Sequence, residues 1–322
     1  MAWYLARAHP RRCAGRRWSR PRGRLRPCPV GCVPSQGRWY LRLPMAHDLH
    51  VHTNRSDGSH DPPDLVEYAA GRGVDVLAIT DHDTMAGVSE AQAAGRAIGV
   101  EVIPGIELSI KVPHGSMHLL GYFADDAPEP LAGLIAGFGD KRLERAKEMV
   151  SRLNDMGVPL DWQDVLDGAA DAPLGRPHIA EALIRAGHVS ERNDAFDLYL
   201  GDDRPAYVRS DGLDVEEGIT LVRESGGAPV LAHPYTLRLD DVHLDPVVGR
   251  LARAGLAGIE VHRPEYSPDQ FAAYGTLARK YGLIASGGSD YHRPTSPHHP
   301  GATGDPPLPE ETVDRLLAAA LG

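Results

Sequence analysis

Cysteine is almost absent from this sequence of 322 residues, and its three cysteines, Cys13, Cys28 and Cys32, all lie near the N-terminus. Residues 45–322 contain none. This part of the chain therefore has no disulfide, no thiolate zinc site and no cysteine nucleophile. Any metal ion bound there must be held by His, Asp and Glu side chains.

Long apolar runs are also missing, because no stretch approaches the roughly 18 apolar residues of a membrane-spanning helix. The composition, 42% hydrophobic and 24% charged, is ordinary for a globular protein and allows one large core or two small ones. We therefore expect a cytoplasmic protein without a membrane partner.

Acidic residues are missing from residues 1–44, which hold eleven arginines and three of the four tryptophans. Subtracting these eleven positive charges from the overall net charge of −10 leaves about −21 for residues 45–322. We interpret residues 1–44 as a disordered tail, or as upstream sequence from a start codon assigned too early, since Met45 lies just before the first predicted strand. An Arg-rich transit peptide and a basic nucleic-acid-binding arm are the alternatives.

Strands and helices alternate in two parts of the remaining chain, residues 45–127 and 206–322. Apolar runs of strand length, such as "VDVLAIT", follow helical segments that end at glycine. Near-continuously apolar strands separated by helices predict a parallel sheet with helices on its outer face. The count of about seven strand–helix units predicts an α/β fold, a distorted (β/α)7 TIM-like barrel.

Residues 128–205 show only helical patterns, including "LERAKEMVSRLNDMG" and "RPHIAEALIRAG". We predict an inserted helical subdomain here, which interrupts the barrel. Within the barrel, the helix after "TDHD" is expected to be capped by Asp83 or Thr84 and to end at Gly99.

The stretch "DLHVHTNRSDG", from Asp48 to Gly58, carries the first chemical signal. Its first half reads as a strand, and alternate side chains of a strand point to opposite faces. Asp48, His50 and His52 should therefore share one face. Imidazole is a common metal ligand, although two histidines at a strand end could equally be hydrogen-bonded residues without a metal.

The other strands resolve this ambiguity. Functional side chains of a barrel gather at the C-terminal ends of its strands, and six or more successive strands here end in a metal-competent residue. Each could be a hydrogen-bonded or capping residue on its own, but together they would leave many buried polar groups unpaired unless they share metal ions. These residues are His50, His52, Asp57, His82, Glu107, His118, His233, His262, Asp290 and His292.

The motifs "DLHVHTNRSDG", "ITDHDT", "GIELS", "HLLGY", "LAHP" and "GGSDYH" resemble the successive motifs of the PHP (polymerase and histidinol phosphatase) domain family. They follow the family's order across residues 45–295. The segment "GRPHIAEALIRAG" resembles the branch of nucleoside 3',5'-bisphosphate phosphatases. That branch also includes enzymes that trim 5'-phosphorylated RNA.

This resemblance implies three divalent metal ions per chain, with manganese, iron and zinc all compatible with such ligands. It also implies hydrolysis of a phosphate ester by metal-activated hydroxide. Asp83 and His262 are the candidate catalytic side chains, with the proton donor left open between Asp83, a histidine and a site water. By motif, His50, His52, Glu107 and Asp290 would hold one ion, Glu107, His118 and His233 a second, and Asp57, His82 and His292 the third.

Basic residues of the insertion are candidates for binding a second phosphate. Arg142 and Arg145 share one face of a helix. Arg176 and His178 begin another helix, whose N-terminus favours anions, and arginine can grip phosphate through two hydrogen bonds. The alternative is that these are solvated surface charges. The expected activity is removal of the 3'-phosphate from nucleoside 3',5'-bisphosphates.

Three other functions remain open. The same site could serve a 5'-3' exonuclease on short 5'-phosphorylated RNA or DNA, a histidinol-phosphate phosphatase, or a non-catalytic metal-binding scaffold. We expect a small nucleotide or short oligonucleotide as the partner. The acidic body disfavours tight binding of long nucleic acid. The oligomeric state is not predicted.

Overall fold

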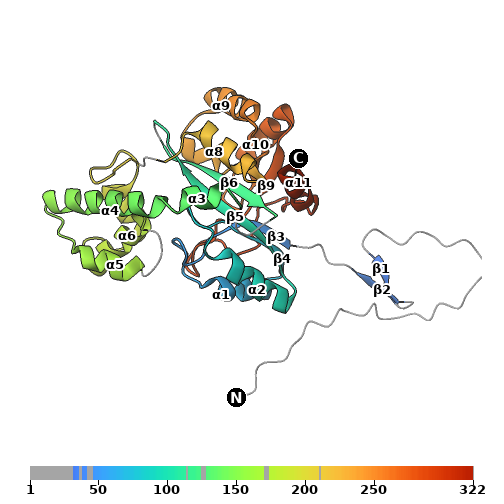
Figure 1. The fold of residues 1–322 in the computed structure, drawn as a ribbon, viewed down its shortest axis with the longest axis horizontal. Helices are drawn as coiled ribbons and strands as arrows, with labels where there is room; N and C mark the ends of the chain where they lie inside the picture. The colour runs from blue at the N-terminus through green and yellow to red at the C-terminus, as the bar shows by residue number, and fades with distance from the viewer. Residues whose placement is uncertain are drawn as a thin grey trace, which may run out of the picture. The chain divides into compact units, whose positions relative to one another are not determined.

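The computed structural model describes residues 46–113, 115–124, 128–169, 174–209 and 212–321, together with two short strands near the N-terminus (Figure 1). These strands, β1 (Cys32–Ser35) and β2 (Arg38–Leu41), form an antiparallel pair that the sequence did not predict. The remainder of the Arg-rich segment, including its predicted disorder, lies outside the described residues. The chain divides into two compact units, residues 1–45 and 46–322.

The second unit is built on a seven-stranded sheet in which the strands follow one another in chain order. All neighbouring strands run parallel except for β6, which is antiparallel to both of its neighbours. The strands are β3 (Ala46–Val51), β4 (Val74–Ile79), β5 (Glu101–Ile110), β6 (Met117–Phe123), β7 (Gly227–Leu231), β8 (Gly258–His262) and β9 (Ile284–Gly287).

The prediction of an all-parallel sheet is therefore wrong at β6. Only residues 111–116 connect β5 to β6. A parallel pair needs a crossover of about a dozen residues or more, whereas a short loop can join only antiparallel neighbours. The length of this loop accounts for the reversed strand.

The two outermost strands of the curled sheet approach each other at one end. Val51 at the end of β3 forms a parallel bridge with Tyr291, which follows β9. The N–H of His52 donates to the carbonyl of Tyr291 at 2.9 Å, and the N–H of Asp290 donates to the carbonyl of His50 at 2.8 Å. The first and last motifs of the sequence thus lie side by side.

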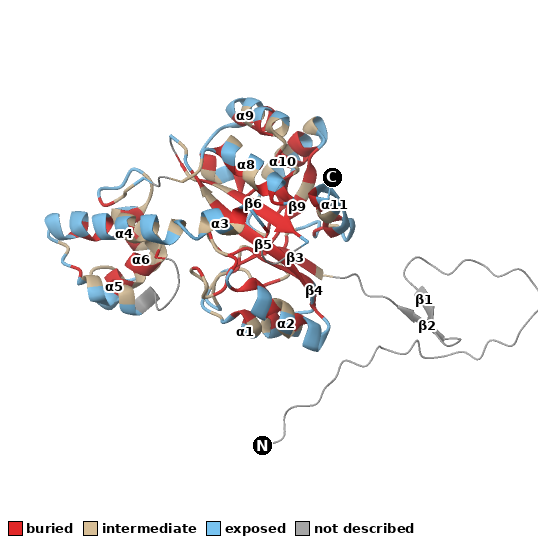
Figure 2. Ribbon diagram, in the orientation of Figure 1, coloured by how far each residue is buried: buried red, intermediate tan, exposed pale blue. Residues whose placement is uncertain are grey.

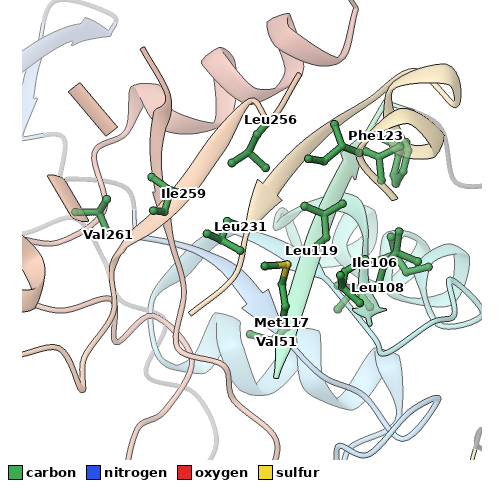
Figure 3. Close-up of a cluster of buried hydrophobic side chains, with 14 of the residues drawn as sticks. Val51, Ile106, Leu108, Met117, Leu119, Phe123, Leu231, Leu256, Ile259 and Val261 are labelled. Carbon is green, nitrogen blue, oxygen red and sulfur yellow. The ribbon is translucent and has the colours of Figure 1, made fainter. Parts of the chain in front are cut away.

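Both faces of the sheet are buried, as Figure 2 shows for the central strands. In β4, Leu77 and Ile79 join one apolar cluster, and Val76 and Ala78 join another on the opposite face. This alternation follows from the two-residue period of a strand. Part of the first cluster is drawn in Figure 3.

Helices supply the partners of both clusters. The first cluster is completed by residues of α1, α2, α8, α9 and α10, and the second by residues of α11. The prediction that Asp83 or Thr84 caps α2 is wrong, because the helix begins after Gly87, while its predicted end at Gly99 is confirmed. These helices are α1 (Pro62–Gly71), α2 (Val88–Ile98), α8 (Val215–Glu224), α9 (Asp241–Ala254), α10 (Pro268–Tyr281) and α11 (Glu311–Ala320).

Between β6 and β7 the chain forms a further group of helices with an apolar cluster of its own, centred on residues such as Met149, Leu153 and Leu183. No strand occurs in the part of this segment that the structure describes. No described helix combines the length and apolarity that crossing a membrane requires. The helices of the group are α4 (Phe138–Asp155), α5 (Trp162–Ala169), α6 (Arg176–Arg185), α7 (Arg192–Ala195) and the π-helical η1 (Phe196–Leu200). The short helix α3 (Leu131–Ile135) precedes them and packs Leu131 into the first cluster of the sheet.

Candidate metal centre

One carboxylate, that of Glu107 on β5, lies at the centre of the predicted ligands. Its side chain is only 1% exposed. Because imidazoles approach both of its oxygens, either oxygen would be available to a metal ion held by these histidines. Oε2 lies 3.2 Å from Nε2 of His50, from Nε2 of His52 and from Nδ1 of His82, while Oε1 lies 2.7 Å from Nδ1 of His118 and 2.9 Å from Nε2 of His233.

Three groups of ligand atoms, each within 4.8 Å of one another, could hold a metal ion. One group is the set expected from the sequence around His50. A second group is the set expected around Asp57, with His52 added to it. In the third group His82 takes the place expected for His233, whose Nε2 nevertheless lies 3.2 Å from Nδ1 of His118. The groups are His50, His52, Glu107 and Asp290; His52, Asp57, His82 and His292; and His82, Glu107 and His118.

The chemistry of these residues fits divalent ions. Nδ1 of His52 and Nδ1 of His82 are buried and form no hydrogen bond among the described residues, although Nδ1 of His82 lies 3.2 Å from Oε2 of Glu107. Burial lowers the pKa of His82 to about 3, which leaves its imidazole neutral and able to donate a lone pair. Burial opposes ionisation of Glu107, but His82 and His118 hold its pKa well below the usual value. His82 and Glu107 thus offer a neutral imidazole beside an ionised carboxylate, a combination that suits manganese, iron or zinc. Burial would lower the pKa of His52, but Asp290 and Glu107 raise it to about 10, so metal binding there would release a proton.

The loop that carries Asp57 is held from two sides. The carboxylate of Asp81 accepts hydrogen bonds from the N–H of Thr53 at 2.7 Å and from Oγ of Ser56 at 2.6 Å. Gly58 closes the loop, because a Cβ atom at this position would lie 2.2 Å from the carbonyl oxygen of His52. This packing directs Oδ1 of Asp57 to a point 3.2 Å from Nε2 of His292.

Glu260 and Arg263 are functional candidates that the sequence analysis missed. Oε1 of Glu260 lies 2.9 Å from Nδ1 of His50, and its Oε2 accepts the N–H of His233 at 2.6 Å. Arg263, which is buried, donates to Glu260 and to Asp290, each at 3.1 Å. Burial alone would raise the pKa of Glu260, but Arg263 and His50 lower it to about 2. Such contacts orient metal ligands.

His262 is not brought to this centre. Its Nδ1 lies 3.1 Å from the carbonyl oxygen of Pro306, and its ring packs edge-on against Phe271. The reason is a register irregularity in β8 between Glu260 and His262, which breaks the alternation of side chains. Nothing in the described contacts supports the predicted catalytic role of His262.

Asp83 is committed to an ion pair with Arg142. Its Oδ2 accepts from Nε of Arg142 at 2.9 Å, and its Oδ1 accepts from the N–H of Ser109 at 2.7 Å. Burial opposes ionisation, yet Arg142 and the Ser109 amide hold the pKa of Asp83 below its usual value. An ionised carboxylate has no proton to give at neutral pH, which disfavours Asp83 as the proton donor.

A cavity of about 220 Å³ joins the cluster to the basic residues of the helical segment. The predicted start of a helix at Arg176 is confirmed. Two guanidinium groups stack on the ring of Tyr207, with Cζ of Arg176 at 5.3 Å and Cζ of Arg145 at 5.8 Å from its centroid. The ionisable residues lining the cavity include Asp57, His82 and His118 from the cluster, the four predicted residues Arg142, Arg145, Arg176 and His178, and two residues not predicted, Lys111 and Arg209.

Buried imidazoles and carboxylates gathered at the edge of such a sheet define a metal-binding α/β protein. Residues 48–172 match the PHP domain. The chain is 32% identical over 251 residues to a 5'-3' exoribonuclease of Haemophilus influenzae, covering 77% of this chain and 90% of that protein. It is also 32% identical to a 3',5'-nucleoside bisphosphate phosphatase of Chromobacterium violaceum over 252 residues, covering 77% of this chain and 87% of that protein. The chain therefore belongs to the PHP family, as its motifs predicted.

A solved structure supports the same conclusion for the fold. An amidohydrolase from Chromobacterium violaceum, with bound sulfate and no metal, superposes with a TM-score of 0.77 at 31% sequence identity. The match covers 84% of this chain and 96% of the other. The curled sheet and its helices are thus shared with a protein of known structure.

Adding manganese to the metal-free full chain is expected to raise its melting temperature, because only the folded chain assembles the buried donors. At a free concentration 100 times the Kd, binding stabilises by about 2.7 kcal/mol. This corresponds to roughly 5 °C for a chain of this size. Thermal unfolding with and without Mn²⁺ measures the shift. The shift should persist in His243→Ala, an exposed histidine, and shrink in His50→Ala; equal shifts in both variants would contradict the assigned site.

Proposed function

We propose that this protein is a metal-dependent phosphoesterase that removes the 3'-phosphate from nucleoside 3',5'-bisphosphates. The observation that carries the proposal is the position of the cationic cavity, which reaches from Asp57, His82 and His118 to Arg145 and Arg176. One phosphate at the metal cluster and a second among the arginines match a substrate with two phosphate groups. The name of the Chromobacterium relative supports this substrate.

The fold we propose is a distorted (β/α)7 barrel formed by residues 45–127 and 206–322. The bridge between Val51 and Tyr291 supports closure of the sheet. The separate apolar cluster of the helices from α4 to η1 supports an inserted subdomain at residues 128–205. The cationic cavity is lined by residues from both parts.

We assign three divalent ions to the cluster, with Glu107 shared between ions. When bound, these ions would supply Lewis-acid polarisation of the phosphate and a source of hydroxide at neutral pH. The side chains of Asp57 and Asp290 are ionised, since neighbouring groups, first among them His292 and His50 respectively, outweigh burial and hold their pKa values well below normal. They therefore complement cations, while the cavity beyond them complements the anionic substrate.

Arg145 and Arg176 are the strongest candidates for gripping the second phosphate. Nε of Arg145 donates to the carbonyl of Val208 at 2.7 Å, and Nη1 of Arg176 donates to Oδ1 of Asp202 at 2.9 Å. Each guanidinium is thus fixed through part of its hydrogen-bonding edge and keeps other N–H groups for a ligand. Arg142 is less available because it is paired with Asp83.

The second candidate function is 5'-3' exonucleolytic cleavage of short 5'-phosphorylated RNA. The name of the Haemophilus relative, which is as similar as the phosphatase, favours it. Both reactions place a phosphate ester at the same cluster. In both, the leaving group is the 3'-oxygen of a nucleoside 5'-phosphate, and they differ in whether the attacked phosphoryl group also carries an oligonucleotide.

Phosphate release from adenosine 3',5'-bisphosphate, adenosine 5'-monophosphate and a short 5'-phosphorylated RNA should be compared, using the full chain with manganese. We expect the bisphosphate to be preferred and its turnover to be lost in His50→Ala but retained in His243→Ala. Faster release of mononucleotides from the RNA would select the exonuclease instead. Metal binding without turnover of any of the three substrates would refute both assignments.

A further inference from the structure

A second cavity, of about 680 Å³, adjoins the cationic cavity. The two share Ser116, Arg176 and Phe196 as lining residues. The second cavity extends from there to Tyr235, Thr236 and Arg238, which follow the metal-cluster residue His233 along the chain. A molecule with a phosphate in the cationic cavity can therefore extend into the second cavity.

Charge distinguishes the two cavities. In the second, Arg176, Arg204 and Arg238 are matched by Asp197, Asp202 and Asp203. Asp202 lies 2.9 Å from Arg176 and 3.9 Å from Arg238, so part of this charge is already paired. The cationic cavity is lined by five arginine and lysine side chains, and its one acidic lining residue is Asp57. The balanced cavity suits an uncharged group, whereas the cationic cavity suits phosphate.

Aromatic surface distinguishes the second cavity further. Tyr235 is 42% exposed, and its ring centroid lies 6.2 Å from that of His233 and 6.0 Å from that of Tyr266. Its hydroxyl has no hydrogen-bond partner among the described residues. Phe196 is half-buried, with Cζ of Arg176 5.6 Å from its ring centroid. A rigid aromatic ring left partly open on a cavity is a stacking surface for another flat ring.

Two backbone irregularities line the same cavity. Phe196 begins the π-helical turn η1, closed by a hydrogen bond from the N–H of Gly201 to its carbonyl at 2.8 Å. Arg238 has a φ of +54°, a conformation that non-glycine residues rarely adopt. Local distortions of this kind concentrate at binding and catalytic sites. They place the side chains of the cavity where regular helices would not.

We propose that the second cavity binds the nucleobase of the substrate and that Tyr235 is the residue on which the base stacks. The Arg176–Phe196 pair forms the wall that the second cavity shares with the cationic cavity. This inference rests on the proposed function, because it assigns the uncharged, aromatic part of a nucleotide. It makes Tyr235 a specificity-determining residue that distinguishes nucleotides from other phosphate esters.

The test compares adenosine 3',5'-bisphosphate with methyl ribofuranoside 3,5-bisphosphate, which lacks a base. In Tyr235→Ala, the ratio of kcat/KM for the nucleotide to that for the baseless substrate is expected to fall about tenfold, through a higher KM for the nucleotide. Tyr235→Phe keeps the ring and should keep the ratio. The matched control is Leu239→Ala, an exposed apolar residue of the same loop that does not line the cavity.

An unchanged ratio in Tyr235→Ala, or an equal fall with Leu239→Ala, would overturn the inference. Failure of the proposed function has a different signature, since the wild-type chain would then release phosphate from neither compound. In that case equilibrium dialysis with adenosine 5'-monophosphate decides the matter. Binding at least about tenfold weaker in Tyr235→Ala than in Tyr235→Phe supports the assignment, and equal binding contradicts it. Metal content should be the same in all the variants.

Discussion

Replacing Glu107 with glutamine is expected to lower phosphate release by more than about 100-fold, beyond the 10–100-fold loss typical when a residue that only supports metal ligands is changed. The reason is its position. Its two oxygens lie within 3.2 Å of nitrogens from five different histidines, and it belongs to two of the three potential metal groups. Glutamine keeps the size of the side chain but removes the negative charge that two neighbouring cations would share.

The change should also appear in metal content, measured on the purified full chain by elemental analysis after dialysis. We expect Glu107→Gln to retain fewer ions per chain than wild type. Glu216→Gln is the matched control, because Glu216 is an exposed glutamate of α8 paired with Arg250. Wild-type metal content and activity in Glu107→Gln would show that Glu107 does not link the ions.

The substitution Arg263→Met is expected to have the largest effect on stability. Its side chain is 2% exposed and contacts Glu260, Glu265 and Asp290. Removing one partner from such a buried network leaves uncompensated carboxylates, at a cost of about 3–5 kcal/mol in the free energy of unfolding. For a chain of this size the melting temperature should fall by roughly 10 °C.

Denaturant unfolding of the metal-free chain measures this loss, and a double-mutant cycle assigns it. The double variant, Glu260→Gln with Arg263→Met, should lose less free energy of unfolding than the two single variants together. The reason is that it no longer buries Glu260 as an unpaired charge. Arg279→Met, an exposed arginine of α10, should be close to neutral. Additive losses at Glu260 and Arg263 would mean that the network is not energetically coupled.

Much of the candidate metal cluster could be anticipated from the sequence, because several of its residues lie at or near the end of an apolar strand. His50 and His52 are two residues apart, and Glu107 follows "GI" in a continuous apolar run. Their convergence depends on strand periodicity and on parallel strands ending at a common edge. His118, the second residue of β6, reaches the same edge because β6 is antiparallel to its neighbours. Strict alternation nevertheless fails in β3, whose register is irregular between Asp48 and Val51. The carboxylate of Asp48 accepts hydrogen bonds from Ser289, from the N–H of Gly301 and from the N–H of His50.

The missed features depend on irregularities that sequence patterns do not report. The register shift in β8 turns His262 away and leaves Glu260 against the cluster. Glu260 is the lone acid in the buried strand "GIEVH", a signal that could have been weighed. The reversal of β6 was also readable, since the loop before it is too short for a crossover. The ion pair of Asp83 with Arg142 joins residues 59 positions apart, and neither sequence neighbourhood predicts it.

The meeting of the first and last strands affects how the protein folds. The candidate ligands His52 and Asp290 lie 238 positions apart, yet Nε2 of His52 lies 3.1 Å from Oδ1 of Asp290. Such distant contacts form slowly, because a long loop must close before they stabilise anything. A chain still emerging from the ribosome has most of its histidines but lacks Asp290 and His292. Loading of the proposed metal centre would thus report that β9 has docked, and a truncated or misfolded chain would lack part of the donor set.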